Sequence, residues 1–396
     1  MQRLTPKIRT RAIDPENNNA NARRHRFTTG VFCLLYLSII YLFVSCKNKS
    51  DALFRLHTPD ETQVHFVNRL TPNDSINPFT FTNFYNGGGV GIGDVNGDGK
   101  PDIFFGGNQV SSRLYLSRID TVSQKWAFED ITEKAGVTTA RWCSGISMVD
   151  INQDGLLDIY ISVASHVKMQ DSENLLFVNQ GNGADGVPTF KELAKAYGLN
   201  TRAFTTQTAF FDADLDGDLD AYMMNTAPDL QNPNFIRKTY HDGSYPSTGR
   251  FYVNEGRQAN GLPRYTDISK DAGITYEGLG LGLAVSDMNK DGYPDIYCSN
   301  DFISSDMLYL NTGKGAQPLF NNVIKEATAH TSLFGMGVDI ADINNDTYPD
   351  IFQLDMLPED NLRQKKMLAG QDYDRKEMRI QNNTAINCST CGICFN

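Results

Sequence analysis

The chain has 396 residues and is 40% hydrophobic, so it is long enough to bury a large core. It carries 36 basic and 47 acidic residues, for a formal net charge of −11, which argues against nucleic acid as a partner. Seven cysteines in a chain of this length exclude a disulfide scaffold.

The N-terminus has the layout of an export leader. Residues 1–26 are basic, residues 31–44 are apolar except for Ser38, and Ser45 precedes Cys46. This order is typical of a signal peptide. The Ser-Cys pair resembles a bacterial lipobox, which makes Cys46 the predicted lipidated residue. An apolar run of 14 residues is shorter than the roughly 20 that span a bilayer. An uncleaved N-terminal anchor is the alternative, and either would hold the chain at a membrane.

Residues 47–85 form a polar N-terminal segment of mixed composition. Short apolar stretches at residues 54–56 and 64–67 predict strands in it. A glycine-rich stretch, residues 87–93, then leads into the most regular part of the chain.

A nine-residue acidic pattern occurs five times, first at Asp94–Asp102. The other copies begin at Asp150, Asp212, Asp287 and Asp342, so successive starts lie 56, 62, 75 and 55 residues apart. Positions 1, 3, 5 and 9 carry Asp or Asn, and position 6 is glycine in four copies. Alternating side-chain oxygens on a tight turn suit calcium, a hard cation that takes six to eight oxygen ligands.

We therefore predict up to five structural Ca²⁺ sites, each bound by the side chains at positions 1, 3, 5 and 9 and by the backbone carbonyl at position 7. The predicted ligand residues are Asp94, Asn96, Asp98, Lys100, Asp102, Asp150, Asn152, Asp154, Leu156, Asp158, Asp212, Asp214, Asp216, Asp218, Asp220, Asp287, Asn289, Asp291, Tyr293, Asp295, Asp342, Asn344, Asp346, Tyr348 and Asp350.

Position 6 of such a loop needs a positive φ, which glycine adopts freely. Gly99, Gly155, Gly217 and Gly292 meet this need, but the fifth loop has Thr347. A β-branched residue there costs about 1–2 kcal/mol, so the fifth site is expected to be the weakest.

Two other structures share parts of this pattern, the EF-hand and the solvated Asp/Gly turn. An EF-hand needs a glutamate at position 12 between two helices. Here position 12 is apolar or Gln353, and the apolar, β-branched runs after position 9 predict strands. Solvated Asp/Gly turns are the other option. Five copies in register, holding 17 of the 47 acidic residues, favour a bound cation that relieves their repulsion.

The loops belong to a larger repeat of four strands. After the strand–loop–strand unit come third strands predicted at residues 114–116, 175–179, 251–254 and 308–311. Fourth strands, each with a short tail, are predicted within residues 128–137, 190–199, 265–274 and 320–326. Four strands per repeat of 55–75 residues predict the blades of an all-β propeller. The third repeat carries an insertion, residues 225–250, expected to form a long loop.

Residues 358–396 leave the pattern and form a C-terminal tail. It contains Cys388, Cys391 and Cys394, whose spacing resembles part of an iron–sulfur or zinc motif. Because a fourth ligand is missing, no metal site is assigned to this tail.

Loops of the form D-x-[DN]-x-D-G-x-x-D-[IL] after an apolar strand resemble FG-GAP or VCBS repeats, the calcium-binding blades of the integrin α-subunit propeller. The resemblance covers residues 86–357. Residues 85–89, 141–143, 299–303 and 354–361 are also similar to bacterial outer-membrane lipoproteins whose propeller precedes an ASPIC/UnbV domain. The resemblance implies a binding or adhesion module with a seven-bladed propeller. Five visible repeats and no such C-terminal domain predict an incomplete or truncated version.

The expected function is therefore a calcium-stabilised binding propeller on the outer membrane or cell surface of a bacterium, with a glycan or a protein as ligand. A polysaccharide lyase or hydrolase on the same scaffold is the alternative, and a truncated gene product is a third. No catalytic residue is assigned, because the six histidines are scattered and G-x-S-x-G and H-E-x-x-H motifs are missing.

Overall fold

The computed structural model describes residues 53–119, 126–164, 173–226, 237–301, 304–313, 315–332, 334–356, 360 and 362–363. The chain divides into two units, Met1–Thr58 and Pro59–Asn396. Of the first unit only residues 53–58 are described, and they are exposed and irregular. The predicted leader, the lipidation site Cys46 and the cysteine-containing tail lie outside the described residues. Among the described residues, no helix is both long and apolar enough to cross a membrane.

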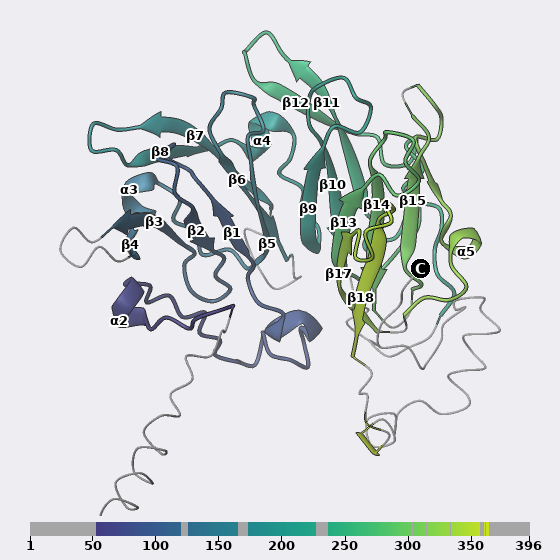
Figure 1. Cartoon of the computed structure of the whole chain (residues 1–396), viewed down its shortest axis with the longest axis horizontal. Coiled ribbons are helices and arrows are strands. Elements are labelled where there is room, and N and C mark those ends of the chain that lie inside the picture. Colours follow the sequence, from purple (N-terminus) through teal and green to yellow (C-terminus); the bar gives the residue numbers. More distant parts are fainter. Residues whose placement is uncertain are drawn as a thin grey trace, which may run out of the picture. The chain divides into compact units, whose positions relative to one another are not determined.

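The second unit is a succession of antiparallel sheets in which each strand pairs with its neighbour in sequence (Figure 1). The first sheet comprises β1 (Val90–Gly93), β2 (Asp102–Phe105), β3 (Arg113–Ile119) and β4 (Trp126–Asp130). The second comprises β5 (Cys143–Val149), β6 (Asp158–Val163), β7 (Leu175–Asn182) and β8 (Pro188–Glu192). The third comprises β9 (Thr205–Phe211), β10 (Asp220–Asn225), β11 (Arg250–Arg257) and β12 (Pro263–Asp267).

The fourth sheet comprises β13 (Gly280–Ser286), β14 (Asp295–Asn300), β15 (Met307–Asn311) and β16 (Phe320–Asn322). The fifth has two described strands, β17 (Gly335–Ala341) and β18 (Asp350–Asp355). The first strands of consecutive sheets lie side by side, β1 by β5, β5 by β9, β9 by β13 and β13 by β17. This is the arrangement of propeller blades, and it confirms the predicted all-β fold with four-stranded blades, open or incomplete over the described residues.

The hydrophobic core lies between consecutive sheets. Ile159 and Ile161 of β6 pack toward the first sheet with Phe104, while Tyr160 between them packs toward the third sheet with Met223. Every residue of β6, β10 and β14 is buried, because the middle sheets are covered on both faces. This explains why the residues after the first aspartate, Ile159–Ile161, Ala221–Met224 and Ile296–Cys298, are apolar in succession rather than alternating with polar residues.

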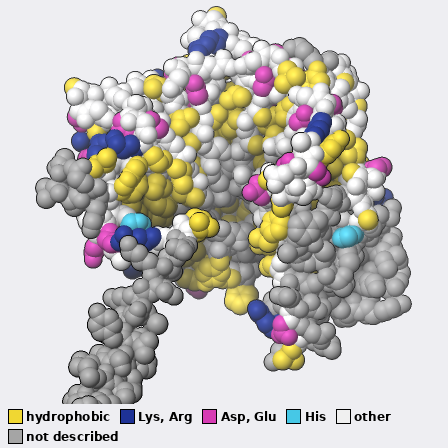
Figure 2. Space-filling view, in the orientation of Figure 1, with side chains coloured by type: hydrophobic (Ala, Val, Ile, Leu, Met, Phe, Trp, Pro, Cys, Tyr) yellow, Lys and Arg dark blue, Asp and Glu magenta, His cyan; other side chains and the backbone are white. Residues whose placement is uncertain are grey.

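The first and fifth sheets differ, because within the described part of the chain each has a neighbouring sheet on one face only. In β2, burial alternates between full and partial along the strand. Val90 and Ile92 of β1 remain more than half exposed, and hydrophobic side chains gather over β2 and β3 (Figure 2). Phe66 of the N-terminal segment covers part of this face by stacking on Phe105, with ring centroids 5.2 Å apart.

Some sequence predictions at the ends of elements are wrong. Residues 54–56 and 64–67 form no strands. The short tails predicted after the fourth strands form a single helical turn in three blades: α3 (Thr132–Ala135), α4 (Ala194–Tyr197) and α5 (Ile324–Ala327). Gly136 and Gly198 end two of these turns in the left-handed conformation, which is a common helix C-cap. The N-terminal segment also contains the short helices α2 (Pro59–Thr62) and η1 (Thr82–Tyr85).

Candidate metal centres

Each acidic loop joins the first strand of its sheet to the second, in the order β1–β2, β5–β6, β9–β10, β13–β14 and β17–β18. The loops therefore lie at one end of the sheets and are flanked by strands. This arrangement excludes the EF-hand geometry, which requires a helix on each side.

The five loops share one set of hydrogen bonds, illustrated by the second loop. The amides of Asp154 and Gly155 donate to Asp150 Oδ1 and Oδ2 at 3.0 and 2.8 Å, and the Asp154 amide also donates to Asn152 Oδ1 at 3.0 Å. The amide of Leu156 donates to Asp154 Oδ1 at 2.9 Å. Equivalent bonds recur in the other four loops. The backbone thus turns the side chains at positions 1, 3 and 5 toward one another.

The backbone is in the left-handed conformation at two positions of each loop, whereas the sequence predicted only position 6. At position 6 the four glycines and Thr347 have positive φ, as predicted, with Thr347 at 76°. At position 4, φ is also positive in every loop, at Gly97, Gln153, Leu215, Lys290 and Asn345. Sequence reasoning missed this second position, because only Gly97 in the first loop signals it.

The aspartate at position 9 is a predicted metal ligand, and it also connects two parts of its blade by hydrogen bonds. Asp158 is fully buried and accepts two backbone hydrogen bonds, from Ile151 at 3.1 Å and from Asn179 on β7 at 2.7 Å. Asp102, Asp220 and Asp295 accept the same pair of bonds from their own loop and third strand. This carboxylate therefore joins each loop to the third strand of its blade, a role that its spacing alone does not indicate.

An asparagine on the third strand extends the connection to the preceding blade. Asn179 Nδ2 donates to the carbonyl of Val95, in the first loop, at 2.8 Å, and to the carbonyl of Leu157 at 3.2 Å. Asn311 Nδ2 donates in the same way to the carbonyl of Ala213 in the third loop at 2.7 Å. Consecutive blades are thus fastened to each other at the acidic loops, and each such bond needs the loop in its folded conformation.

The third loop brings its carboxylates closest to the arrangement that a cation requires. Oxygens of Asp212, Asp214 and Asp216 all lie within 4.8 Å of one another. In the second, fourth and fifth loops the position-3 residue is Asn, and its Nδ2 donates to the position-5 carboxylate at 2.8–3.0 Å. In the first loop, Lys100 Nζ lies 3.0 Å from Asp98 Oδ2.

The electrostatics of these loops suit a positive ion. Burial and, to a smaller extent, the neighbouring loop carboxylates raise the pKa of Asp158 and of Asp220 to about 7, although each group also accepts two backbone hydrogen bonds that lower its pKa. Burial and the surrounding aspartates likewise raise the pKa of Asp218 to about 6. A divalent cation would favour the ionised form of all of these groups. The donor set, carboxylate and amide oxygens on a pinned turn, matches the chemistry of Ca²⁺.

A cluster outside the loops bears on the enzymatic alternative. In the insertion of the third repeat, Arg237 binds Glu277 through both guanidinium nitrogens at 2.6 and 2.8 Å and lies 4.1 Å from the ring centroid of Tyr245. Glu277 is 3% exposed and also accepts the Tyr240 amide at 2.6 Å. Both carboxylate oxygens are thus engaged, and the cluster holds the insertion against the fourth blade. The adjoining cavity has a volume of only about 140 Å³.

Comparison with known families agrees with this geometry. A family model described as FG-GAP-like repeat matches residues 94–161 and 287–352. These stretches contain the first, second, fourth and fifth acidic loops, and the third loop has the same hydrogen bonds. The chain therefore contains FG-GAP-like repeats.

Among solved structures, the chain is similar to the crystal structure of the V. cholerae biofilm matrix protein Bap1. The two share 14% sequence identity over 67% of this chain and 34% of that chain, with a TM-score of 0.32. The chain thus spans about a third of that protein's length. A comparison with curated protein sequences finds no match.

Proposed function

We propose that this chain is a calcium-stabilised binding or adhesion propeller that works outside the cytoplasm, with a glycan or a protein as its ligand. The observation that carries the proposal is the repetition of one hydrogen-bonded arrangement of side-chain oxygens in five loops, one in each described blade. A site for chemistry is usually single and concave, whereas these five loops are alike and each serves its own blade. They therefore suit structural ions.

In this proposal the residues at positions 1, 3 and 5 would hold Ca²⁺, together with the position-7 carbonyl and the position-9 carboxylate. The bound ion would supply positive charge to a cluster of buried and half-buried carboxylates. This charge would stabilise the loop conformation in which the loop carbonyls accept hydrogen bonds from Asn179 and Asn311 of the following blade. Calcium would thus stabilise the contacts between blades.

The extracytoplasmic location rests on the FG-GAP-like repeats and on the leader predicted at residues 1–46. Calcium is abundant outside cells, where sites of modest affinity can be filled. Attachment to a membrane through Cys46, or through an uncleaved anchor, belongs to the proposal and is tested by metabolic labelling of the wild-type chain and of Cys46→Ser with a palmitate analogue.

The metal part of the proposal predicts the outcome of removing one loop. Asp216→Ala deletes a position-5 ligand in the third loop, so the variant should bind one calcium equivalent fewer than the wild type, by metal analysis after gel filtration. Asp271→Ala, an exposed acid outside the loops, is the matched control and should leave the count unchanged. Loss of every equivalent from Asp216→Ala would contradict independent sites, and no calcium in the wild type would reject the proposal.

The binding part is tested by screening the full chain, with calcium, against a glycan array and a set of bacterial surface proteins. Each hit is then incubated with the protein and examined for cleavage by mass spectrometry. Binding without cleavage supports a recognition module. Cleavage of a bound glycan would favour the enzymatic alternative instead.

A further inference from the structure

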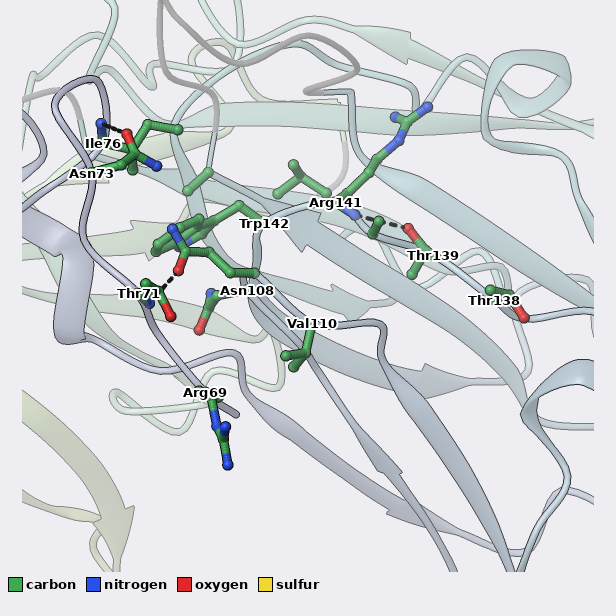
Figure 3. A pocket seen from close by; sticks show the side chains of 14 residues that line it. Arg69, Thr71, Asn73, Ile76, Asn108, Val110, Thr138, Thr139, Arg141 and Trp142 are labelled. Atoms are coloured by element: carbon green, nitrogen blue, oxygen red, sulfur yellow. Dashed lines mark hydrogen bonds between the residues drawn. The ribbon is translucent and has the colours of Figure 1, made fainter. Parts of the chain in front are cut away.

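A large cavity lies at the end of the first two sheets that is opposite to the acidic loops. Its volume is about 880 Å³. In an antiparallel meander the β1–β2 connection is at one end, and the β2–β3 and β4–β5 connections are at the other. Asn108 and Val110 come from the β2–β3 connection, and Thr139 and Arg141 come from the β4–β5 connection (Figure 3). The cavity is therefore separate from the candidate metal centres.

The cavity is built by a clamp between the N-terminal segment and the first blade. Asn68 Nδ2 donates to Asn108 Oδ1 at 2.6 Å, and the Asn108 amide donates to Asn68 Oδ1 at 3.1 Å. The amide of Thr71 donates to Gln109 Oε1 at 2.5 Å. Asn108 is buried, and its Nδ2 also donates to the carbonyl of Cys143 at 2.7 Å. This two-way amide pair fixes one wall of the cavity to the sheet before any ligand arrives.

An aromatic cluster supports the floor. Trp142 lines the cavity and packs edge-on against Phe81, with ring centroids 5.0 Å apart, and against Phe84 at 5.5 Å. Ile76 and Val110 add apolar surface beside it. The floor is thus rigid and apolar in part, while the walls are polar.

The charge of the lining is opposite to that of the chain. Arg69 and Arg141 line the cavity, and none of the described residues that line it is acidic, although the whole chain carries a net charge of −11. The Arg69 side chain is exposed and makes no hydrogen bond or ion pair with another described residue. Arg141 is held by a hydrogen bond from Nη1 to the carbonyl of Glu173. The remaining polar lining residues are Thr71, Asn73, Asn108, Gln109, Thr138 and Thr139.

We propose that this cavity binds a uronate-containing oligosaccharide, an inference that rests on the proposed binding function and specifies its ligand. Guanidinium groups bind carboxylates in a two-pronged geometry. Figure 3 shows Arg69 and Arg141 on opposite sides of Asn108, with both guanidinium groups pointing away from it, so a ligand that reaches both must extend across the cavity and can present carboxylates on separate sugar units. Amide and hydroxyl side chains suit sugar hydroxyls, and the apolar floor suits the face of a sugar ring. The volume is in the range of ligand cavities, roughly 300–1,000 Å³.

The test uses the full chain at a fixed, saturating calcium concentration and a fluorescently labelled oligogalacturonate tetramer, with binding followed by anisotropy. The methyl ester of the same tetramer is the matched ligand, because it keeps the sugars and loses the charges. The wild type should bind the acid at least about tenfold more tightly than the ester. Arg69→Gln and Arg141→Gln should each weaken binding severalfold, and the double variant should weaken it at least about tenfold. Arg69→Lys keeps the charge but loses the two-pronged geometry, so its affinity should lie between those of the wild type and of Arg69→Gln.

Arg264→Gln is the control variant, because Arg264 is 64% exposed and lies on the third blade, away from the cavity. It should bind like the wild type. Equal binding of the acid and the ester, an unchanged affinity in the double variant, or competition by oligoglutamate as strong as by unlabelled tetramer would each overturn the inference.

Calcium content and melting temperature are measured on the same samples to separate this inference from the proposed function. If the double variant keeps its calcium and melts like the wild type, loss of tetramer binding is assigned to the cavity. If the wild type holds calcium and binds other array glycans or proteins but not the tetramer, the inference fails and the proposed function stands. A wild type without calcium would count against the proposed function itself.

Discussion

At the scale of single residues, the acidic loops combine strain with electrostatic repulsion. Thr347 holds φ at 76°, and Leu215 and Lys290 hold φ near 60° at position 4. Residues with a β-carbon are disfavoured in this region by about 1 kcal/mol or more. The bonds that the position-1 carboxylate accepts hold the backbone there, so the loop geometry depends on that aspartate.

Thr347→Gly tests the strain in the fifth loop. Glycine accepts positive φ without steric cost, so the substitution should stabilise the protein by about 1 kcal/mol in denaturant unfolding at saturating calcium. Thr347→Ala is the matched control, because it also removes the hydroxyl that Lys290 Nζ contacts at 2.8 Å but keeps the β-carbon. A glycine variant no more stable than the alanine variant would show that the conformation carries no strain.

At the scale of elements, the third-strand asparagines of the second and fourth blades, Asn179 and Asn311, connect each of these blades to its predecessor. Asn179 is 2% exposed, and its amide satisfies two loop carbonyls in two different blades. Leaving a buried carbonyl without its hydrogen-bond donor lowers the stability of the folded state by roughly 1–3 kcal/mol. These asparagines therefore stabilise the packing of blade against blade.

Asn179→Ala should destabilise the protein by about 2–3 kcal/mol in equilibrium urea unfolding, because both carbonyls lose their partner. The matched control is Asn182→Ala. Asn182 Nδ2 also donates to a loop carbonyl, that of Asn96 at 2.7 Å, but at an exposed position. Losing this hydrogen bond should lower the free energy of unfolding by less than about 0.5 kcal/mol, because water can take the place of the Asn182 amide. Equal effects of the two substitutions would reject the role given to the buried asparagine.

A buried carboxylate in the fourth blade predicts a pH dependence. Asp306 is 1% exposed, and burial raises its pKa from 3.8 to about 6, although it accepts bonds from the Asn300 amide at 2.8 Å and the Tyr297 hydroxyl at 3.1 Å. Between pH 4 and 6 the unfolded chain ionises at this position while the folded chain holds its proton. Asp306 therefore makes the folded state less stable as pH rises through this window.

Asp306→Asn removes the ionisable group. The free energy of unfolding of the variant minus that of the wild type should therefore rise by about 2 kcal/mol from pH 4 to pH 6 and level off above about pH 7. Urea unfolding at several pH values, with calcium held constant, measures this difference. A difference that does not change with pH would show that Asp306 ionises as freely in the folded protein as in the unfolded one.

Sequence reasoning predicted the blades well because their signals are local. The acidic nonapeptide fixes the turn, and continuous apolar runs such as residues 159–161 mark strands that are covered on both faces. The predictions that failed depend on contacts distant in sequence. Residues 64–67 form no strand, and Phe66 among them instead packs on Phe105. The clamp between Asn68 and Asn108, and the cavity beside it, join segments 40 residues apart, so no local pattern indicates them.

At the scale of the molecule, the loops concentrate negative charge at one end of the sheets. They hold 17 of 47 acidic residues in a chain with a net charge of −11, and five divalent ions would bring that charge close to neutrality. Each ion that binds only the folded loop adds to stability by mass action. Because neighbouring blades are fastened at these loops, the contributions should add to one cooperative transition rather than to separate local ones.

The melting temperature of the full chain, measured by calorimetry with excess EGTA, with calcium and with magnesium, tests the account most directly. Calcium should raise the melting temperature by about 10 °C or more over EGTA. Magnesium should raise it far less, since it demands a tighter octahedral geometry and loses its water reluctantly. An identical melting temperature in calcium and in EGTA would contradict the claim that calcium ions hold these blades together.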